Sequence, residues 1–212
     1  MTIACIGLGN MGAPMARCLI AAGHSVIGFD PQTRSDGIPC APTAALAVQD
    51  VDVVISMLPN GDILRAVCDD IYEHMSQGAL HLDCSTVDVQ SAKDTAQATK
   101  IEGLMAVDAP VSGGIGGATN GTLTFMAGGK ADAFAKAAPL FDIMGQRAVH
   151  CGASGSGQAA KICNNMILGA TMIATCEAFA LADRLGLDRQ SMFDVVSTSS
   201  GQSWSINTYC PA

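Results

Sequence analysis

Apolar positions along this chain fall into two alternating patterns. Short apolar runs of strand length are separated by longer stretches in which apolar residues recur three and four positions apart, the spacing of one helix face. Strands that alternate with helices predict a mostly parallel sheet covered on both faces, the doubly wound α/β class. The predicted strands are 2–7, 25–30, 51–57, 79–83, 105–109, 122–127 and 146–150, and the predicted helices between them are 13–22, 62–74, 87–102 and 131–143.

The pattern changes after Gly152. One long helical pattern runs over 156–185 and stops at Gly186, a residue type favoured just beyond helix ends. Asp188 is placed to cap a further, shorter helix that reaches about Ser197. We therefore expect two domains, an α/β domain over residues 1–152 and, over 153–212, a long linking helix with the start of an all-helical domain.

The second domain is predicted to need a partner. About sixty residues that form one long and one short helix bury little apolar surface of their own. The sequence reaches Ala212 without a further helix to close a core. We expect the long helix to pack on another copy of the chain in a homo-oligomer, or the chain to be truncated within its helical domain.

Composition and charge narrow the function classes. Of the 212 residues, 49% are hydrophobic and 14% are charged, and the formal net charge is -8. Lysines and arginines form no cluster that could neutralise phosphates, so nucleic acid is not expected as a partner. No basic leader precedes the first strand, and the longest uncharged stretch of the long helix, 162–176, is short for a membrane span. We expect a soluble protein that does not contact a membrane.

Cysteine and histidine usage points to a reducing compartment. The nine cysteines contain no C-x-x-C pair, and most of them lie in apolar runs, where a reduced thiol behaves as a small apolar side chain. The four histidines are scattered. A cytoplasmic location fits best, and neither a disulfide framework nor a metal site is expected.

The first strand-helix-strand unit carries a glycine pattern. Gly7, Gly9 and Gly12 have the spacing G-x-G-x-x-G directly after a strand and at the start of a helix. In Rossmann-type domains these glycines allow a tight turn, close approach of a pyrophosphate, and close packing of helix on strand. Asp30, at the end of the second strand, can accept hydrogen bonds from the adenosine ribose and repels a 2′-phosphate, so NAD is favoured over NADP, with Arg34 as the opposing feature. The alternative is that the glycines serve only the turn.

A second glycine-containing segment follows the fifth strand. Ser112 is followed by Gly113 and Gly114, and a hydroxyl next to two unhindered backbone N–H groups can cradle a carboxylate. An ordinary Ser-Gly turn would have the same sequence. We expect residues 113–121 to form a glycine-rich loop.

Lys161 lies near the start of the long helix. Asn164 and Asn165 follow three and four residues later, on the same helix face. With amides and apolar side chains as neighbours, desolvation would lower the pKa of this lysine toward the range of a general acid or base. The alternative is a structural lysine that extends past apolar neighbours into solvent.

Five segments carry a resemblance to a known family. Four of them resemble the β-hydroxyacid dehydrogenase family in order and spacing, and the last is most similar to its 3-hydroxyisobutyrate dehydrogenase members. The segments are GLGNMGAPMA at 7–16, DAPVSGG at 108–114, TLTFMAG at 122–128, GSGQAAKICNN at 155–165 and SSGQSWSINTYCP at 199–211. The resemblance implies an NAD-dependent enzyme of valine catabolism that oxidises 3-hydroxyisobutyrate, or a close 3-hydroxy acid, to its semialdehyde.

The resemblance also implies residue roles. It makes Lys161 the acid/base group, with Asn165 orienting the substrate. The implied substrate-binding residues are Ser112, Gly113, Gly114 and Asn164. The implied NAD-binding residues are Gly7, Leu8, Gly9, Asn10, Met11, Gly12, Asp30, Leu58, Pro59 and Thr86.

Other functions share these motifs. Sister reductases that act on tartronate semialdehyde, glyoxylate or succinic semialdehyde would carry all of them. A non-catalytic NAD-binding or interaction protein would retain the fold. Family members continue into a helical domain with a further lysine-containing motif, which the sequence up to Ala212 does not contain. The resemblance therefore does not imply that this chain is active by itself.

Overall fold

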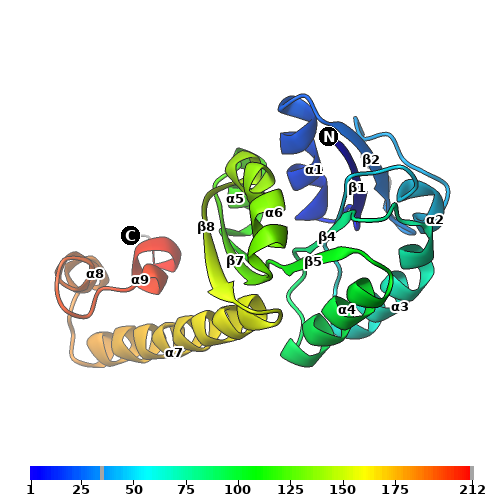
Figure 1. Cartoon of the computed structure of the whole chain (residues 1–212). Coiled ribbons are helices and arrows are strands. Elements are labelled where there is room, and N and C mark those ends of the chain that lie inside the picture. The colour runs from blue at the N-terminus through cyan, green and yellow to red at the C-terminus, as the bar shows by residue number, and fades with distance from the viewer. Residues whose placement is uncertain (34–35, 211–212) are drawn as a thin grey trace. The chain divides into compact units, whose positions relative to one another are not determined.

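The computed structural model describes residues 1–33 and 36–210, and these form two compact units, Met1–Lys161 and Ile162–Ala212. Arg34, the residue that opposes the preference for NAD, lies outside the described residues, as do Pro211 and Ala212. The first unit is built around a sheet with strand order β2-β1-β3-β4-β5-β7-β6, and β8 pairs with β7 (Figure 1). Its strands are β1 (Thr2–Ile6), β2 (Ser25–Phe29), β3 (Val53–Ser56), β4 (Leu80–Asp83), β5 (Met105–Asp108), β6 (Val111–Ser112), β7 (Leu123–Gly129) and β8 (Gly145–Gly152).

Strand direction confirms a mostly parallel sheet. The strands β2, β1, β3, β4 and β5 are parallel neighbours, and β8 is parallel to β7. The strand β7 runs antiparallel to both β5 and β6. The helices of the unit are α1 (Gly12–Ala21), α2 (Ala44–Ala47), α3 (Gly61–Ile71), α4 (Val89–Ile101), α5 (Gly114–Asn120) and α6 (Ala131–Met144), and the 3-10 helix η1 (Tyr72–His74) follows α3.

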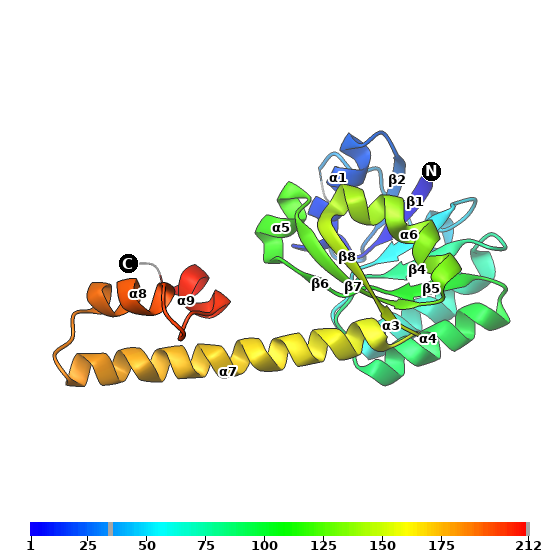
Figure 2. The same ribbon diagram turned by 60° about the vertical axis from the view of Figure 1, so that its left-hand side comes forward.

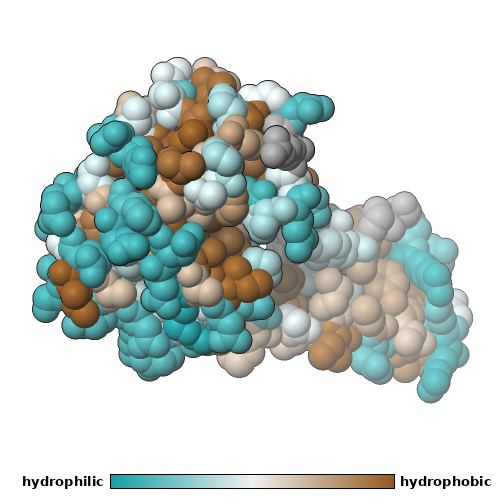
Figure 3. Space-filling model, turned by 90° about the vertical axis from the view of Figure 1, so that its right-hand side faces the viewer, coloured by the Kyte–Doolittle hydropathy of each residue, from teal (hydrophilic) through white to brown (hydrophobic). Residues whose placement is uncertain are grey.

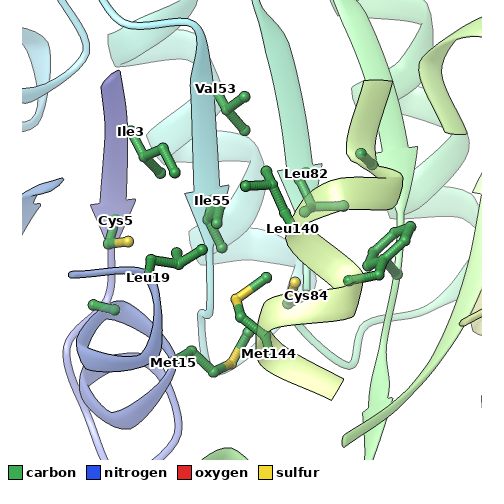
Figure 4. Close-up of a cluster of buried hydrophobic side chains, with 14 of the residues drawn as sticks. Ile3, Cys5, Met15, Leu19, Val53, Ile55, Leu82, Cys84, Leu140 and Met144 are labelled. Atoms are coloured by element: carbon green, nitrogen blue, oxygen red, sulfur yellow. The ribbon is translucent and has the colours of Figure 1, made fainter. Parts of the chain in front are cut away.

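Alternating strand residues fill two cores, one on each face of the sheet. Ile3 and Cys5 of β1 belong to a buried cluster with residues of α1 and α6, whereas Ala4 and Ile6 belong to a second cluster with α2 and α3. Successive side chains of a strand point to opposite faces, so both faces of a central strand must be apolar. Figure 4 shows the first cluster between the strands and helices α1 and α6. The side of this unit seen in Figure 3 carries many hydrophilic side chains, with apolar ones between them.

Helix caps explain where two of these helices begin. Asn60 precedes α3, and its side chain accepts a hydrogen bond of 2.9 Å from the Ile63 N–H. Asp88 precedes α4 and accepts one of 2.8 Å from the Ser91 N–H. Such side chains satisfy N–H groups that have no partner inside the helix. Both helices therefore start directly after loops that leave the sheet.

Residues 113–121 are not the loop that the glycine content predicts. Most of them form helix α5, which is flanked by Gly113 and by Gly121, the latter in the left-handed region at a φ of 64°. The helix packs against α1: Ala118 is fully buried, and the Cys18 thiol donates to the Ala118 carbonyl at 3.4 Å. Tertiary packing of this kind outweighs the low helix propensity of glycine. The sequence pattern also does not predict the short elements α2, β6 and α9 (Trp204–Tyr209).

The described part of the second unit, up to residue 210, contains the helices α7 (Ser156–Arg184), which begins in the first unit, α8 (Arg189–Ser197) and α9 (Trp204–Tyr209). The long helix α7, visible as one uninterrupted rod in Figure 2, and α8 with its Asp188 cap confirm the predicted helices. Within the unit, the hydroxyls of Thr171 and Ser205 lie 2.9 Å apart, and Ala182 and Ile206 are buried.

Helix α7 is long and apolar enough, by length and composition, to cross a membrane. The helix as a whole, with 29 residues, is long enough to span a bilayer, although its longest stretch without a charged residue, 162–176, is short for a span. The mean hydropathy of the qualifying segment is 1.4, and a core helix of a soluble protein can have the same property. A single helix of this kind is therefore weak evidence for a membrane span.

Candidate functional site

The carboxyl ends of five parallel strands meet at one edge of the sheet (Figure 1). Their last residues form one continuous row, in which Phe29 pairs with Ile6, Ile6 with Ser56, Ser56 with Asp83 and Asp83 with Asp108. Loops that follow such a row start at the same level, and ligands of open α/β sheets bind outside these strand ends. The register therefore gathers the loops that carry the predicted cofactor residues.

The glycine turn after β1 has the backbone that its three glycines predict. Gly7 is in the left-handed region at a φ of 92°, and a Cβ there would collide with the Met57 carbonyl oxygen. A Cβ on Gly12 would collide with the Gly7 carbonyl oxygen. A Cβ on Gly9 would meet nothing within 4 Å. Gly7 and Gly12 are thus required by packing, whereas Gly9 leaves open space over the start of α1, where a pyrophosphate can approach the backbone.

Asp30 directly follows β2 and is bound to the glycine turn. One carboxylate oxygen accepts the Leu8 N–H at 2.8 Å, and the other accepts the N–H groups of Gln32 and Thr33, each at 2.8 Å. Partial burial raises the pKa of Asp30, but these three hydrogen bonds outweigh it and the net pKa is lowered. The side chain is therefore a carboxylate at neutral pH, with hydrogen-bonding capacity left for a ribose hydroxyl.

The loops after β3 and β4 are tied together. The Leu58 N–H donates to the Ser85 hydroxyl at 2.8 Å. Leu58 is partly buried, while Pro59 and Thr86 are exposed. In the glycine turn, Leu8 is buried, Met11 is partly buried and Asn10 is exposed. With Asp30 after β2, the structure thus places the predicted cofactor residues on the four loops that follow the adjacent strands β2, β1, β3 and β4.

Lys161 reaches the segment that carries Ser112. Its ammonium donates to the Val111 carbonyl at 2.7 Å. Ser112 is partly buried, and Gly113 and Gly114, with φ values of 132° and 60°, are exposed at the start of α5. The predicted acid/base group and the predicted carboxylate cradle therefore lie next to each other.

Burial lowers the pKa of Lys161 from its ordinary value of 10.5. Among the described residues, no carboxylate forms an ion pair with it. Asn164 and Asn165 lie further along α7 in the second unit, and the Asn164 amide donates to the Asn165 side-chain oxygen at 3.3 Å. A lysine with a lowered pKa and no carboxylate partner can exist as the neutral amine that a proton acceptor requires.

A buried polar network beneath these loops was not predicted. The Tyr72 hydroxyl lies 2.7 Å from Nδ1 of His81, Nε2 of His81 lies 2.9 Å from the Ser56 hydroxyl, and that hydroxyl donates to Asp83 at 2.7 Å. One arrangement of protons satisfies the whole chain: Tyr72 donates to a neutral His81, which donates to Ser56. Burial lowers the pKa of His81 to about 4, which agrees with a neutral ring.

Asp83 ends this network as a buried acid. One of its oxygens also accepts the Ser85 N–H at 3.1 Å, and the other has no hydrogen-bond partner among the described residues. Burial, partly offset by the bonds from Ser85 and Ser56, raises the pKa of Asp83 to about 6. The sequence signal that could have identified the network is a set of polar residues inside otherwise apolar strands.

Comparisons with known proteins show which family the chain resembles in sequence and fold. Residues 2–153 match the family model described as the NAD binding domain of 6-phosphogluconate dehydrogenase, and residues 155–212 match the NAD-binding region of NADP-dependent 3-hydroxyisobutyrate dehydrogenase. The probable 3-hydroxyisobutyrate dehydrogenase of Mycobacterium tuberculosis is 44% identical over 216 residues, which cover 99% of this chain and 74% of that protein. The chain belongs to the β-hydroxyacid dehydrogenase family.

A further relative and a solved structure support the same assignment. The NAD-dependent L-serine dehydrogenase of Pseudomonas aeruginosa is 45% identical over 218 residues, which cover 99% of this chain and 73% of that protein. The solved structure of the Mycobacterium tuberculosis 3-hydroxyisobutyrate dehydrogenase with L-serine superimposes with a TM-score of 0.94 at 44% identity, over 100% of this chain and 75% of that one. The predicted family and the predicted fold class are confirmed.

Membership of the β-hydroxyacid dehydrogenase family makes this chain an oxidoreductase with an NAD-binding domain. The residues present fit that cofactor. The backbone at Gly9 is open enough for a phosphate to approach it, and a charged Asp30 follows β2, where a ribose hydroxyl is tolerated better than a 2′-phosphate.

Proposed function

We propose that this β-hydroxyacid dehydrogenase oxidises 3-hydroxyisobutyrate, or a close 3-hydroxy acid, to its semialdehyde with NAD. The observation that carries the proposal is the hydrogen bond from Lys161 to the Val111 carbonyl, which holds an amine beside the Ser112 segment. L-Serine is the second candidate, because it is also a 3-hydroxy acid and names the Pseudomonas aeruginosa relative.

The proposed cofactor site combines the four loops that follow β1, β2, β3 and β4. The pyrophosphate binds over Gly9 at the start of α1, with Leu8, Asn10 and Met11 around it, and Asp30 accepts hydrogen bonds from the adenosine ribose. Leu58 and Pro59 lie along the cofactor, and Thr86 lies near the nicotinamide ribose. When bound, NAD supplies the hydride acceptor.

Substrate orientation is assigned to the segment after β6. The Ser112 hydroxyl and the N–H groups of Gly113 and Gly114 bind the substrate carboxylate, and both glycines are exposed residues without a side chain that could cover them. Holding the carboxylate at this place fixes the hydroxyl-bearing carbon near Lys161. Orientation of this kind can contribute several kcal/mol to catalysis.

Lys161 is proposed as the proton acceptor. Oxidation of an alcohol removes a hydride from carbon and a proton from oxygen, so a base must reach the hydroxyl at hydrogen-bond distance. Desolvation, which lowers the pKa of Lys161, increases the fraction of neutral amine at neutral pH. In the reverse direction the ammonium returns the proton. Asn165 orients the substrate without adding charge, with Asn164 close by.

The proposed setting is that of a small-molecule enzyme. Oxidation of 3-hydroxyisobutyrate places the chain in valine catabolism, and we propose a soluble, cytoplasmic protein that assembles as a homo-oligomer through its helical region. Exposed apolar side chains on α7, such as Ile167 and Ile173, support the assembly.

The test compares the chain with its Lys161→Ala variant. NADH formation is followed on 3-hydroxyisobutyrate, L-serine and other short hydroxy acids, and binding of NAD and NADP is measured separately by calorimetry. We expect 3-hydroxyisobutyrate to give the highest kcat/KM, NAD to bind more tightly than NADP, and Lys161→Ala to lose about a hundredfold or more in kcat with little change in NAD affinity.

Other outcomes of these assays would support a different function or a different role for Lys161. Preferred reduction of tartronate semialdehyde, glyoxylate or succinic semialdehyde would identify a sister reductase. NAD binding without turnover of any hydroxy acid would identify a non-catalytic NAD-binding protein. Turnover that survives Lys161→Ala would reject the acid/base role and make the lysine structural.

A further inference from the structure

The start of helix α7 is held by a carboxylate from the sheet. Asp108, the buried last residue of β5, accepts the Gly155 N–H at 2.7 Å on one oxygen and the Gln158 N–H at 3.1 Å on the other. The first N–H groups of a helix have no partner inside it, so Asp108 supplies the cap from another element. The position of the first turn of α7 is therefore set by β5.

Two glycines let this turn lie directly on the strand end. A Cβ on Gly157 would collide with the Asp108 carbonyl oxygen and come within 2.8 Å of its carboxylate, and one on Gly128 would lie 2.7 Å from both the carboxylate and the Gly157 N–H. Only residues without a Cβ allow such close backbone approach. The contact leaves no room for the turn to shift toward the sheet.

Gln158 adds a second attachment to the neighbouring loop. Its side chain is fully buried, its oxygen accepts the Val87 N–H at 3.1 Å, and its amide group donates to the Ser85 carbonyl at 2.8 Å. Ser85 and Val87 are the two neighbours of Thr86. The amide therefore spans the backbone on either side of the residue assigned to the nicotinamide ribose.

Lys161 lies one helical turn beyond Gln158. Its backbone continues the turn that Asp108 and Gln158 hold, and its ammonium is bound to Val111, three residues after Asp108. Lys161 is thus attached at both ends to the segment that leaves β5. Neither Asp108 nor Gln158 is expected to touch a substrate, because both side chains are buried.

We propose that Asp108 and Gln158 are positioning residues that fix Lys161 and Thr86 relative to each other, and so fix the proton acceptor relative to the nicotinamide end of the cofactor. This inference rests on the proposed function for the roles of Lys161 and Thr86. A misplacement of about 1 Å in a reacting group can cost about a hundredfold in rate. Loss of either attachment should therefore act on turnover more than on cofactor binding.

The test uses near-isosteric variants, Asp108→Asn and Gln158→Met, which remove hydrogen bonds while keeping side-chain volume. The matched controls are Asp188→Asn, which changes the cap of α8, and Gln190→Met, which removes the amide that donates to Asp194 on that helix. The pKa of Lys161 is measured by NMR on protein with ¹³C-labelled lysine. The chain has five lysines, and the signal of Lys161 is identified as the one that disappears in a Lys161 variant. NAD affinity, kcat and KM are measured on the same proteins.

In Asp108→Asn and Gln158→Met we expect the pKa of Lys161 to rise toward 10.5, because the side chain is released toward solvent. We expect kcat to fall about tenfold or more with NAD affinity nearly unchanged, and both controls to match the parent. An unshifted Lys161 pKa in both folded variants, or an equal shift in the controls, would overturn the proposal. The NMR readout does not require turnover, so an inactive parent chain would count against the proposed function and leave this inference to be decided by the pKa.

Discussion

At the scale of single residues, the buried acid Asp83 is the clearest departure from ordinary core chemistry. It closes a chain of hydrogen bonds through Ser56 and His81, yet one of its oxygens has no partner among the described residues. A charged carboxylate in such surroundings is destabilised by desolvation. The residue therefore links the stability of the domain to pH.

The raised pKa of Asp83 determines whether the stability of the domain rises or falls with pH. Burial raises the pKa of Asp83 from 3.8 to about 6, so the folded state binds a proton that the unfolded state has lost between these values, and stability falls as pH rises through them. Asp83→Asn keeps an acceptor for Ser56 and removes the charge. We expect its free energy of unfolding, relative to the parent, to increase from about pH 4 to about pH 8 by up to roughly 3 kcal/mol, measured by urea unfolding with circular dichroism.

Asp52→Asn provides a control of opposite sign. The Thr2 N–H and hydroxyl lower the pKa of Asp52, so the parent gains stability as pH rises through the ordinary aspartate range, and the variant should lose that gain. A pH-independent difference for Asp83→Asn, or the same sign in both variants, would show that the Asp83 carboxylate is not held at a raised pKa.

At the scale of elements, two glycines of the turn between β1 and α1 are expected to have different roles, Gly12 in packing and Gly9 in cofactor binding. Gly12 faces the Gly7 carbonyl, whereas a Cβ on Gly9 would meet only open space. We expect Gly12→Ala to lower the free energy of unfolding by about 1–3 kcal/mol, the usual cost of overpacking. Gly9→Ala should leave stability within about 0.5 kcal/mol of the parent and weaken NAD binding about tenfold or more, because its methyl group occupies the space over the turn.

Urea unfolding and NAD calorimetry on the two variants test this separation. An equal loss of stability in both would show that Gly9 is also a packing residue. Unchanged NAD affinity in Gly9→Ala would place the pyrophosphate elsewhere and remove the main support for the proposed cofactor site.

The elements also show why sequence patterns predicted so much of the fold. Local signals were sufficient for the strands other than the two-residue β6, for α7, and for the cap at Asp188, because each depends on neighbours within a few positions. Helix α5 was missed because its glycine-rich sequence has low helix propensity and its stability comes from contacts with α1. The attachments of Asp108 and Gln158 were missed because they join residues about fifty or more positions apart, and no local pattern encodes them.

At the scale of the whole molecule, the two units differ in how they bury apolar surface. The first unit encloses two clusters, one on each face of its sheet. Among the described residues of the second unit, Ala182 and Ile206 are buried apolar residues, while Ile173, Leu181 and Leu185 are exposed along or just after α7. Exposed apolar surface of this extent is typical of interaction sites.

The proposed self-association through α7 leads to a prediction about the mass of the protein in solution. We expect the parent to have a solution mass at least twice that of the 21.6 kDa chain in size-exclusion chromatography with light scattering, and Ile173→Glu to shift it toward the monomer, because a buried charge at an interface is strongly unfavourable. Ile101→Glu is the matched control: Ile101 lies at the end of α4 and is 73% exposed, close to the 68% of Ile173, but belongs to the first unit. A monomeric parent, or equal dissociation by both substitutions, would contradict assembly through the helical region. We also expect Ile173→Glu to lower the Tm of the protein and Ile101→Glu to leave it unchanged. This difference would show that association through the apolar side of α7 contributes to stability, as expected for a unit whose own core is small.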